Sequence, residues 1–496
     1  MENEQKQSNL RWWILLTVII GTFLGRLDQT IVSLATPKII EDFHITVSAA
    51  GWISTAYILA NAVFVPIWGK LGDTIGRKKV YILGFTIFIA GSVLAGLAWD
   101  LNSMIVFRVI QAIASSADYP TAMAILAVTF KNGKERNQAL GIWSSAFAAS
   151  SVFGPLIGGP LIDNFGWRSI FLVNLPIGIL GLLMAIRFIN ESVSAEKNMH
   201  FDWWGAITLG ISLSSLVLVL DRGFDWGWLS ISALACYLIV ALSTIVFVRI
   251  EKSSLEPIVD LKFLKNSAFV NTLANNFIVF MGLVGSIFLI PIFAQTFLGY
   301  DATQTGYLFI PMAFALLLAA PIGASLTSSS IKPGHIIAAS TLVAAVGLYM
   351  FSFLDPKSTA LNIIVPMLVM AFGLGFGMSQ RTSVIASVVP QNEIGVASSI
   401  LALARNIAGA FGIAIFSTIL SNTTENNVLK LGQMSVFHGT SAVAYQQFIA
   451  LIELKAQIGA YGTVFLISSI ILVVGAIMAL FLNVKSIDPE IKVQVD

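Results

Sequence analysis

The sequence predicts an all-α polytopic membrane protein whose chain crosses the bilayer about fourteen times. Hydrophobic residues make up 56% of its 496 residues and charged residues only 11%, whereas a soluble protein needs far more charge to cover its surface. A transmembrane helix needs about 20 mostly apolar residues to cross ~30 Å of hydrocarbon. The expected spans lie near residues 11–35, 49–69, 79–98, 101–127, 138–162, 167–189, 204–221, 229–249, 267–297, 303–327, 335–354, 361–389, 395–420 and 458–482.

The first apolar segment is too long for a signal peptide, and many more follow it, so we expect it to be retained as the first span. Basic residues then set the orientation. Of the 28 lysines and arginines, 18 fall on the side of the N-terminus, 6 on the opposite side and 4 inside spans. Cytoplasmic loops carry an excess of these residues. We therefore expect a multi-pass protein of the inner (cytoplasmic) membrane with both termini in the cytoplasm.

Charged stretches at 190–202 and 251–265 bracket the seventh and eighth spans. This pattern predicts three parts and one long outer loop. The three parts are a six-helix bundle at 1–190, an inserted helix pair at 191–265, and a second six-helix bundle at 266–496. The long outer loop lies in the last part, near 421–457. Two six-span halves around a midplane site are typical of secondary transporters.

Composition also disfavours several partners. The net charge of +2 and the lack of a long basic run argue against binding to nucleic acid. One cysteine and four scattered histidines leave no plausible zinc site. We find no phosphate-binding loop, so ATP is not the expected direct energy source.

The loop between the second and third spans reads GKLGDTIGRKK, from Gly69 to Lys79. Its glycines, Gly69 and Gly76 among them, allow a tight turn. Asp73 can lie near a helix N-terminus, whose dipole favours negative charge, and Arg77 with two lysines holds the loop in the cytoplasm. An ordinary positively charged inner loop has the same features, and both interpretations stay open from this segment alone.

Two later spans carry further motifs. In the fourth, RVIQAIASS places Arg108 and Gln111 three residues apart, hence on one helical face. In the fifth, FGPLIGGPLID lets a neighbouring helix approach closely at its glycines, while its prolines bend the span. The residues of interest in this segment are Gly154, Pro155, Gly158 and Gly159.

In this order and topology, the motifs resemble those of the fourteen-span drug:proton antiporter branch of the major facilitator superfamily. The resemblance extends to GWISTAYILANAVFVPIWGKLGD in the second span and to GVASSILALARNIAGAFGIAI from Gly395 to Ile415. It implies a major facilitator fold, with two six-helix bundles plus two inserted helices, and transport without a cofactor or metal.

The resemblance also implies roles by position. Asp28 would be the membrane-embedded acid of the first span, and Arg108 the buried basic residue tied to proton coupling. Residues 154–159 would form the antiporter motif. The cytoplasmic gate would comprise Gly69, Asp73, Gly76, Arg77, Glu135 and Arg136. The chain departs from the family pattern at Ala112, usually glycine, and at Arg26 and Asp118.

Depth estimates bring two of these charges together. At ~1.5 Å per residue, Asp28 and Arg108 lie roughly 12 Å and 10 Å below the outer ends of their helices, so they could meet at one level. Proton coupling and a fixed structural salt bridge are both open interpretations of such a pair. Asp118 lies roughly 26 Å deep. It is either a second stop for the proton or a local hydrogen-bond partner of the inner loops.

Aromatic, amide and basic side chains along the core spans are candidates for lining a substrate pocket by stacking or cation–π contact. They are Phe23, Arg26, Tyr57, Asn61, Gln111, Tyr119, Trp143, Asn275, Asn276, Phe280, Tyr307 and Arg405. Packing against lipid or other helices is the alternative for each. Arg381, near an inner span end, is expected to extend its side chain to the interface.

The expected function is proton-driven antiport that exports small amphipathic compounds, drugs among them, by alternating access, as in multidrug efflux and antibiotic resistance. We expect a monomer in the lipid bilayer. The alternative is a dedicated exporter or flippase for one organic anion or lipid-like substrate, because the spans hold four arginines against two aspartates. An enzyme is disfavoured because the spans lack a catalytic cluster, and a channel because glycine–proline helices in two halves suit rocking.

Overall fold

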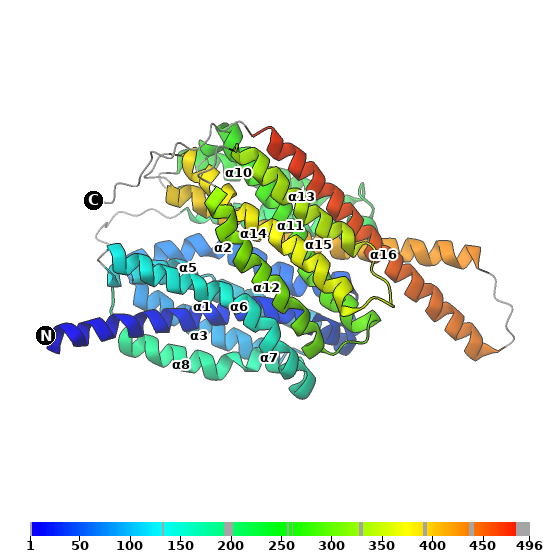
Figure 1. The fold of residues 1–496 in the computed structure, drawn as a ribbon, viewed down its shortest axis with the longest axis horizontal. Coiled ribbons are helices and arrows are strands. Elements are labelled where there is room, and N and C mark those ends of the chain that lie inside the picture. Colours follow the sequence, from blue (N-terminus) through cyan, green and yellow to red (C-terminus); the bar gives the residue numbers. More distant parts are fainter. Residues whose placement is uncertain are drawn as a thin grey trace. The chain divides into compact units, whose positions relative to one another are not determined.

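The computed structural model describes residues 2–130, 133–192, 202–254, 257–259, 261–326, 331–389, 394–435 and 441–482, and every regular element in them is helical (Figure 1). The elements are α1 (Glu2–Phe43), α2 (Val47–Ile75), α3 (Arg77–Gly96), α4 (Leu101–Ser115), α5 (Asp118–Thr129), α6 (Gly133–Phe165), α7 (Ser169–Leu172), α8 (Asn174–Phe188), α9 (Trp203–Trp226), α10 (Ile231–Ser253), η1 (Phe263–Lys265), α11 (Ser267–Phe297), α12 (Ala302–Ser325), α13 (Pro333–Phe351), α14 (Ala360–Ser387), α15 (Ile394–Met434) and α16 (Ala442–Leu480).

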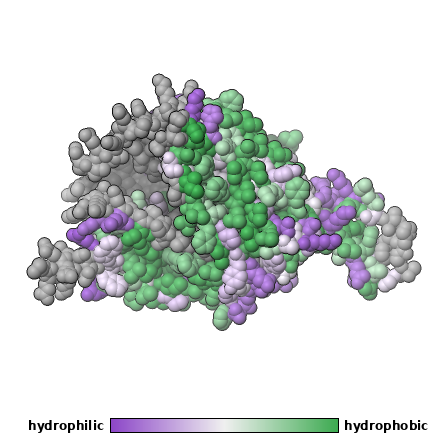
Figure 2. Space-filling view, viewed as in Figure 1, coloured by the Kyte–Doolittle hydropathy of each residue, from purple (hydrophilic) through white to green (hydrophobic). Residues whose placement is uncertain are grey.

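Twelve helices among the described residues are long and apolar enough to cross a membrane. Figure 2 shows apolar side chains covering the helices, with hydrophilic residues gathered towards helix ends. On α10, Leu234, Leu238 and Leu242 are 50%, 59% and 54% exposed on successive turns, an apolar stripe suited to lipid rather than water. The prediction of an all-α polytopic membrane protein is confirmed. The twelve do not include the expected spans 101–127 and 138–162.

Two of the expected spans are interrupted. The segment 101–127 divides into α4 and α5. Pro120 lacks a backbone N–H, and its ring conflicts with the carbonyl of Ser116, where the helix breaks. The segment 167–189 divides into α7 and α8 in the same way, four residues before Pro176.

Most of the segment expected as a long outer loop near 421–457 is helical. α15 and α16 have 41 and 39 residues, or about 60 Å each, against ~30 Å of hydrocarbon. The segment contains no proline and many good helix formers, so the helices continue beyond the apolar stretch. The Asn427 side chain joins the two extensions by donating to the Ala456 carbonyl at 3.2 Å.

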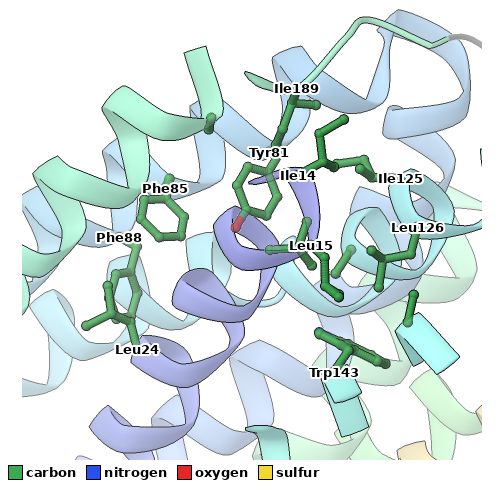
Figure 3. Close-up of a cluster of buried hydrophobic side chains, with 14 of the residues drawn as sticks. Ile14, Leu15, Leu24, Tyr81, Phe85, Phe88, Ile125, Leu126, Trp143 and Ile189 are labelled. Atoms are coloured by element: carbon green, nitrogen blue, oxygen red, sulfur yellow. The ribbon is translucent and has the colours of Figure 1, made fainter. Parts of the chain in front are cut away.

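The chain forms two compact units. The first comprises Met1–Val219, Leu229–Ile258 and Tyr300–Tyr307. Within it, α1 packs against α6 and α8, and α3 against α4 and α8 (Figure 1). Its core gathers apolar side chains from these helices around Tyr81, Phe85 and Trp143 (Figure 3).

The second unit comprises Leu220–Trp228, Val259–Gly299 and Leu308–Asp496. In it α11 packs against α15, and α13 packs against α14 and α16. One core cluster joins Phe263 and Phe269 to Ile385 and Ile400. Each unit therefore has its own apolar core.

Candidate functional site

A fully buried ion pair lies at the centre of the first unit. Arg108 of α4 donates from Nη1 to Asp28 Oδ2 of α1 at 2.5 Å. The two side chains are 1% and 0% exposed. The structure thus brings together the two charges whose estimated depths agreed. An ionisable pair inside a span is costly, so its presence points to function or to a strict structural need.

Neutral side chains complete the coordination of Asp28. Gln111 Nε2 and Asn174 Nδ2 donate to its Oδ1 at 2.9 and 3.1 Å. Asn174 also donates to Ser92 Oγ at 2.9 Å, and Gln111 Oε1 accepts from Arg108 at 2.6 Å. Three elements, α1, α4 and α8, therefore meet at one carboxylate, and α3 joins them through Ser92 and Asn174. The sequence interpretation missed Asn174 and Ser92, although an asparagine inside the apolar segment FLVNLPIG was a usable signal.

Aromatic rings cover the guanidinium of Arg108. The ring centre of Tyr57 lies 4.0 Å from its Cζ and that of Phe171 5.6 Å, within the range of cation–π attraction. The Tyr57 hydroxyl donates to Ser115 Oγ at 2.7 Å, and Asn61 Nδ2 donates to the same oxygen at 3.0 Å. The pocket candidates Tyr57, Asn61 and Gln111 thus gather beside the ion pair.

Asp118 forms a second polar group at the start of α5. Its Oδ2 accepts from Thr22 Oγ1 of α1 at 2.8 Å, and Trp143 Nε1 donates to the same hydroxyl at 2.9 Å. Its Oδ1 is buried with no hydrogen-bond partner among the described residues. The local partner of Asp118 is therefore a span residue, not an inner loop. The ring of Tyr119 contacts that of Trp143 at a tilt of 45°, with ring centres 5.3 Å apart.

A small cavity lies beside this second group. Its volume is about 20 Å³, and Ser115, Tyr81, Gly21 and Asp118 are among the residues that line it. Such a volume holds roughly one water molecule. Ser115 faces the cavity and also accepts from Tyr57. The cavity therefore lies between the surroundings of Asp118 and those of Arg108.

The α2–α3 turn is held by a residue that the sequence interpretation did not select. Gly76 has φ +113°, a backbone conformation that glycine adopts without strain. Glu191 accepts from the backbone N–H groups of Lys78 and Lys79 at 3.0 and 3.3 Å, where a helix N-terminus favours negative charge. Arg77 N donates to the Ser192 carbonyl at 3.0 Å.

The remaining gate candidates are distributed around this turn. Glu135 pairs with Arg11 of α1 at 3.2 Å. Gly69 packs against Pro120 of α5. The side chains of Asp73 and Arg136 lie outside the described residues. The expected roles of Asp73 and Arg136 in the cytoplasmic gate therefore stay predictions.

The glycine–proline segment of α6 lies against α1 and against the start of α12, which belongs to the first unit. A Cβ at Gly154 or Gly158 would collide with Thr30 or Ile31 of α1. At Gly159 it would meet the backbone of Thr303, and the Pro155 carbonyl faces Gly306. Close approach of helix backbones is what small residues in a span permit. The start of α12 is further held by the Asp163 carboxylate, which accepts from the backbone N–H groups of residues 302 and 303 at 3.1 and 2.8 Å.

Three pocket candidates meet in the second unit. Arg405 of α15 donates from Nε to Asn276 Oδ1 at 3.3 Å, and its Cζ lies 5.0 Å from the ring centre of Phe280. The remaining candidates have other contacts. Arg26 donates to Gln29 on its own helix at 2.9 Å, the ring of Phe23 contacts that of Phe153 at a tilt of 58°, and Tyr307 is 52% exposed.

The prediction that Arg381 extends to the interface is wrong. Its side chain is 0% exposed. Nε donates to Asn275 Oδ1 at 2.8 Å, and Nη2 donates to Thr341 Oγ1 at 2.9 Å. Helix α14 packs against both α11 and α13. The position of Arg381 on α14 therefore directs its side chain into the unit and not along the span.

Comparisons with known proteins identify the family of the chain. A family model described as Major Facilitator Superfamily matches residues 18–413. The chain is 32% identical over 431 residues to the multidrug transporter protein MdtP of Bacillus subtilis, covering 86% of this chain and 78% of that protein. It is 31% identical over 421 residues to the riboflavin transporter RibZ of Clostridioides difficile, covering 84% and 90%.

Solved structures give the same fold. The chain aligns with a bacterial homolog of the human lysosomal transporter Spinster, in an inward-facing and occupied conformation, with a TM-score of 0.70. The alignment covers 95% of this chain and 96% of that one at 16% sequence identity. At this identity the likeness concerns the fold alone, and the expected major facilitator fold is confirmed.

Proposed function

The chain belongs to the Major Facilitator Superfamily, and on this basis we propose that it is a proton-coupled antiporter that exports small amphipathic compounds, drugs among them, by alternating access. Membership makes it a secondary transporter and not an enzyme. The observation that carries the proposal is the buried Asp28–Arg108 pair with its ring of amide donors. The multidrug transporter among its relatives supports the substrate class.

Asp28 is the exchange site in this proposal. A proton and a cationic substrate cannot both occupy the carboxylate, because protonation removes the charge that attracts the cation. A proton from outside neutralises Asp28 and displaces the substrate. Loss of that proton to the inside restores the charge, so inward proton movement is coupled to outward substrate movement.

Asp118 is the second stop on the proton route. The cavity of about 20 Å³ lies between Ser115 and Asp118, and the Ser115 hydroxyl contacts Tyr57 beside Arg108. One water molecule in the cavity would extend the hydrogen bonding from the unpartnered Oδ1 of Asp118 in the direction of the Asp28–Arg108 pair. Protons then travel from Asp28 to the deeper acid and onward to the cytoplasm.

The topology belongs to the same proposal. Counting α6 as a span, and α4 with α5 as one interrupted span, adds two to the twelve long apolar helices and gives fourteen. The excess of basic residues on the N-terminal side supports cytoplasmic termini. The α2–α3 turn, with Gly76, Arg77 and Glu191, is then the cytoplasmic gate. Helices α9 and α10 are the inserted pair. The protein acts as a monomer.

Transport in vesicles tests the proposal directly. Inside-out membrane vesicles that carry the wild-type chain should accumulate a fluorescent lipophilic cation when their interior is acidified. The accumulation should collapse when an uncoupler dissipates the proton gradient. Vesicles with well-expressed protein and no gradient-dependent accumulation would contradict export of lipophilic cations.

Asp118→Asn is expected to weaken coupling without abolishing it. The amide keeps an acceptor for Thr22 but cannot carry a proton, so proton-driven accumulation should fall about five- to tenfold, which corresponds to roughly 1–1.5 kcal/mol. Thr22→Val is the matched control, because it removes the hydroxyl that donates to Asp118 and leaves the acid in place. Unchanged accumulation in Asp118→Asn would remove this residue from the proton route.

A dedicated exporter or flippase for one organic anion or lipid-like compound is the second candidate. Arg381, fully buried among neutral partners, favours it. The riboflavin transporter among the relatives supports specificity for one compound. In the vesicle assay this candidate predicts no accumulation of the lipophilic cation.

A further inference from the structure

The second unit contains a fully buried arginine, Arg381, inside an apolar helix, and its hydrogen-bond partners among the described residues are all neutral. Arg381 lies in α14 and Arg405 in α15, while the sequences of α11, α12, α13 and α14 contain no aspartate or glutamate. The first unit differs, because Arg108 has Asp28 as its direct counter-ion.

Arg381 keeps one side of its guanidinium unoccupied. Nε and Nη2 donate to neutral oxygens of Asn275 and Thr341, while Nη1 is buried and has no hydrogen-bond partner among the described residues. Gly377 lies next to Nη1, and a Cβ there would come within 2.6 Å of it. The same Cβ would come within 2.2 Å of Ser340 Oγ, so only glycine fits between Ser340 and this side of the guanidinium.

Asn276 supplies a second unpartnered donor in the same region. It follows Asn275 on α11 and is 0% exposed. Its Oδ1 accepts from Arg405 Nε, so its amide nitrogen Nδ2 points elsewhere and has no partner within the described part of the chain. The open groups on Arg381 and Asn276 are thus both donors, and a ligand for them must bring acceptors.

The charge of Arg381 requires a counter-charge. A guanidinium stays protonated in proteins, and a buried charge without a partner is strongly unfavourable. The neutral acceptors of Asn275 and Thr341 satisfy hydrogen bonds but supply no negative charge. We propose that the second unit binds a small anion, or the anionic group of a transported compound, at Arg381 Nη1 with Asn276 and Arg405 alongside.

This site goes beyond the proposed antiport, since it concerns binding and does not depend on proton coupling at Asp28. An inorganic anion such as chloride and a carboxylate group of an organic compound share the required chemistry. Thermal unfolding of the purified full chain separates them. The sodium salt of a bulky sulfonate sets the ionic strength. It is replaced stepwise by sodium acetate or sodium chloride at constant ionic strength. Unfolding is followed by tryptophan fluorescence.

The wild-type chain should show a saturable rise in Tm of about 2–5 °C with at least one of the two anions. A larger rise with acetate identifies a carboxylate group as the ligand, and a larger rise with chloride identifies an inorganic ion. Arg381→Gln removes the positive charge, and Asn276→Asp supplies a counter-charge from the protein. Both variants should lose the rise, whereas Arg168→Gln, an exposed arginine of the first unit, should keep it.

A flat Tm in the wild type with both anions would overturn the proposal. So would an equal rise in Asn276→Asp, because it would indicate a general salt effect. If Arg381→Gln does not fold, Asn276→Asp still decides, since the arginine and its hydrogen bonds to Asn275 and Thr341 remain in that variant.

Discussion

Asp28→Asn is expected to abolish proton-driven accumulation of a lipophilic cation in inside-out vesicles. The side chain keeps its size and one acceptor oxygen for Gln111 and Asn174. It can no longer take up or release a proton, and it removes the negative charge that attracts the substrate. We expect a loss of about 10²-fold or more, the range that a positioned proton-transfer group contributes to a rate.

Two matched variants make this result specific. Asp28→Glu keeps a titratable group and should retain part of the activity. Asp42→Asn removes another acid of α1, one that forms a half-exposed pair with Arg168, and should transport like the wild type. Gradient-driven accumulation that survives in Asp28→Asn would show that this carboxylate is a fixed structural partner of Arg108, and coupling would have to be sought elsewhere.

Arg108→Gln is expected to give the largest loss of stability among single substitutions at the ion pair. It leaves the Asp28 carboxylate buried without its counter-ion, a change that costs about 3–5 kcal/mol. It also removes the cation–π contact with Tyr57, which is worth up to about 2 kcal/mol when desolvated. The unfolding temperature of the purified chain should fall by about 10 °C.

The double variant Asp28→Asn with Arg108→Gln tests the reason for this loss. Because neither side chain is then charged, the double variant should be several degrees more stable than Arg108→Gln alone. The exposed pair of Arg168 with Asp42 provides the comparison, and Arg168→Gln should cost no more than about 1 kcal/mol. A double variant no more stable than Arg108→Gln would mean that the two charges are not energetically coupled.

Much of the fold could be predicted from local patterns in the sequence. Apolar segments of about 20 residues identify spans because unpaired backbone groups in lipid must be satisfied within a helix. The same reasoning placed Asp28 and Arg108 at one depth. It did not specify the conformation of 421–457, most of which is helical, because a hydropathy window cannot distinguish a polar helix from a loop.

The sequence by itself determined the membrane class, the family motifs and the level of the buried charges in the bilayer, since these depend on composition and on spacing along one helix. Only the tertiary structure decided which residues meet. Asn174 joins Asp28 across 146 positions, Glu191 holds the start of α3, and Arg381 turns into the second unit. These contacts depend on how helices pack and rotate against one another, which the periodicity of a single helix does not specify.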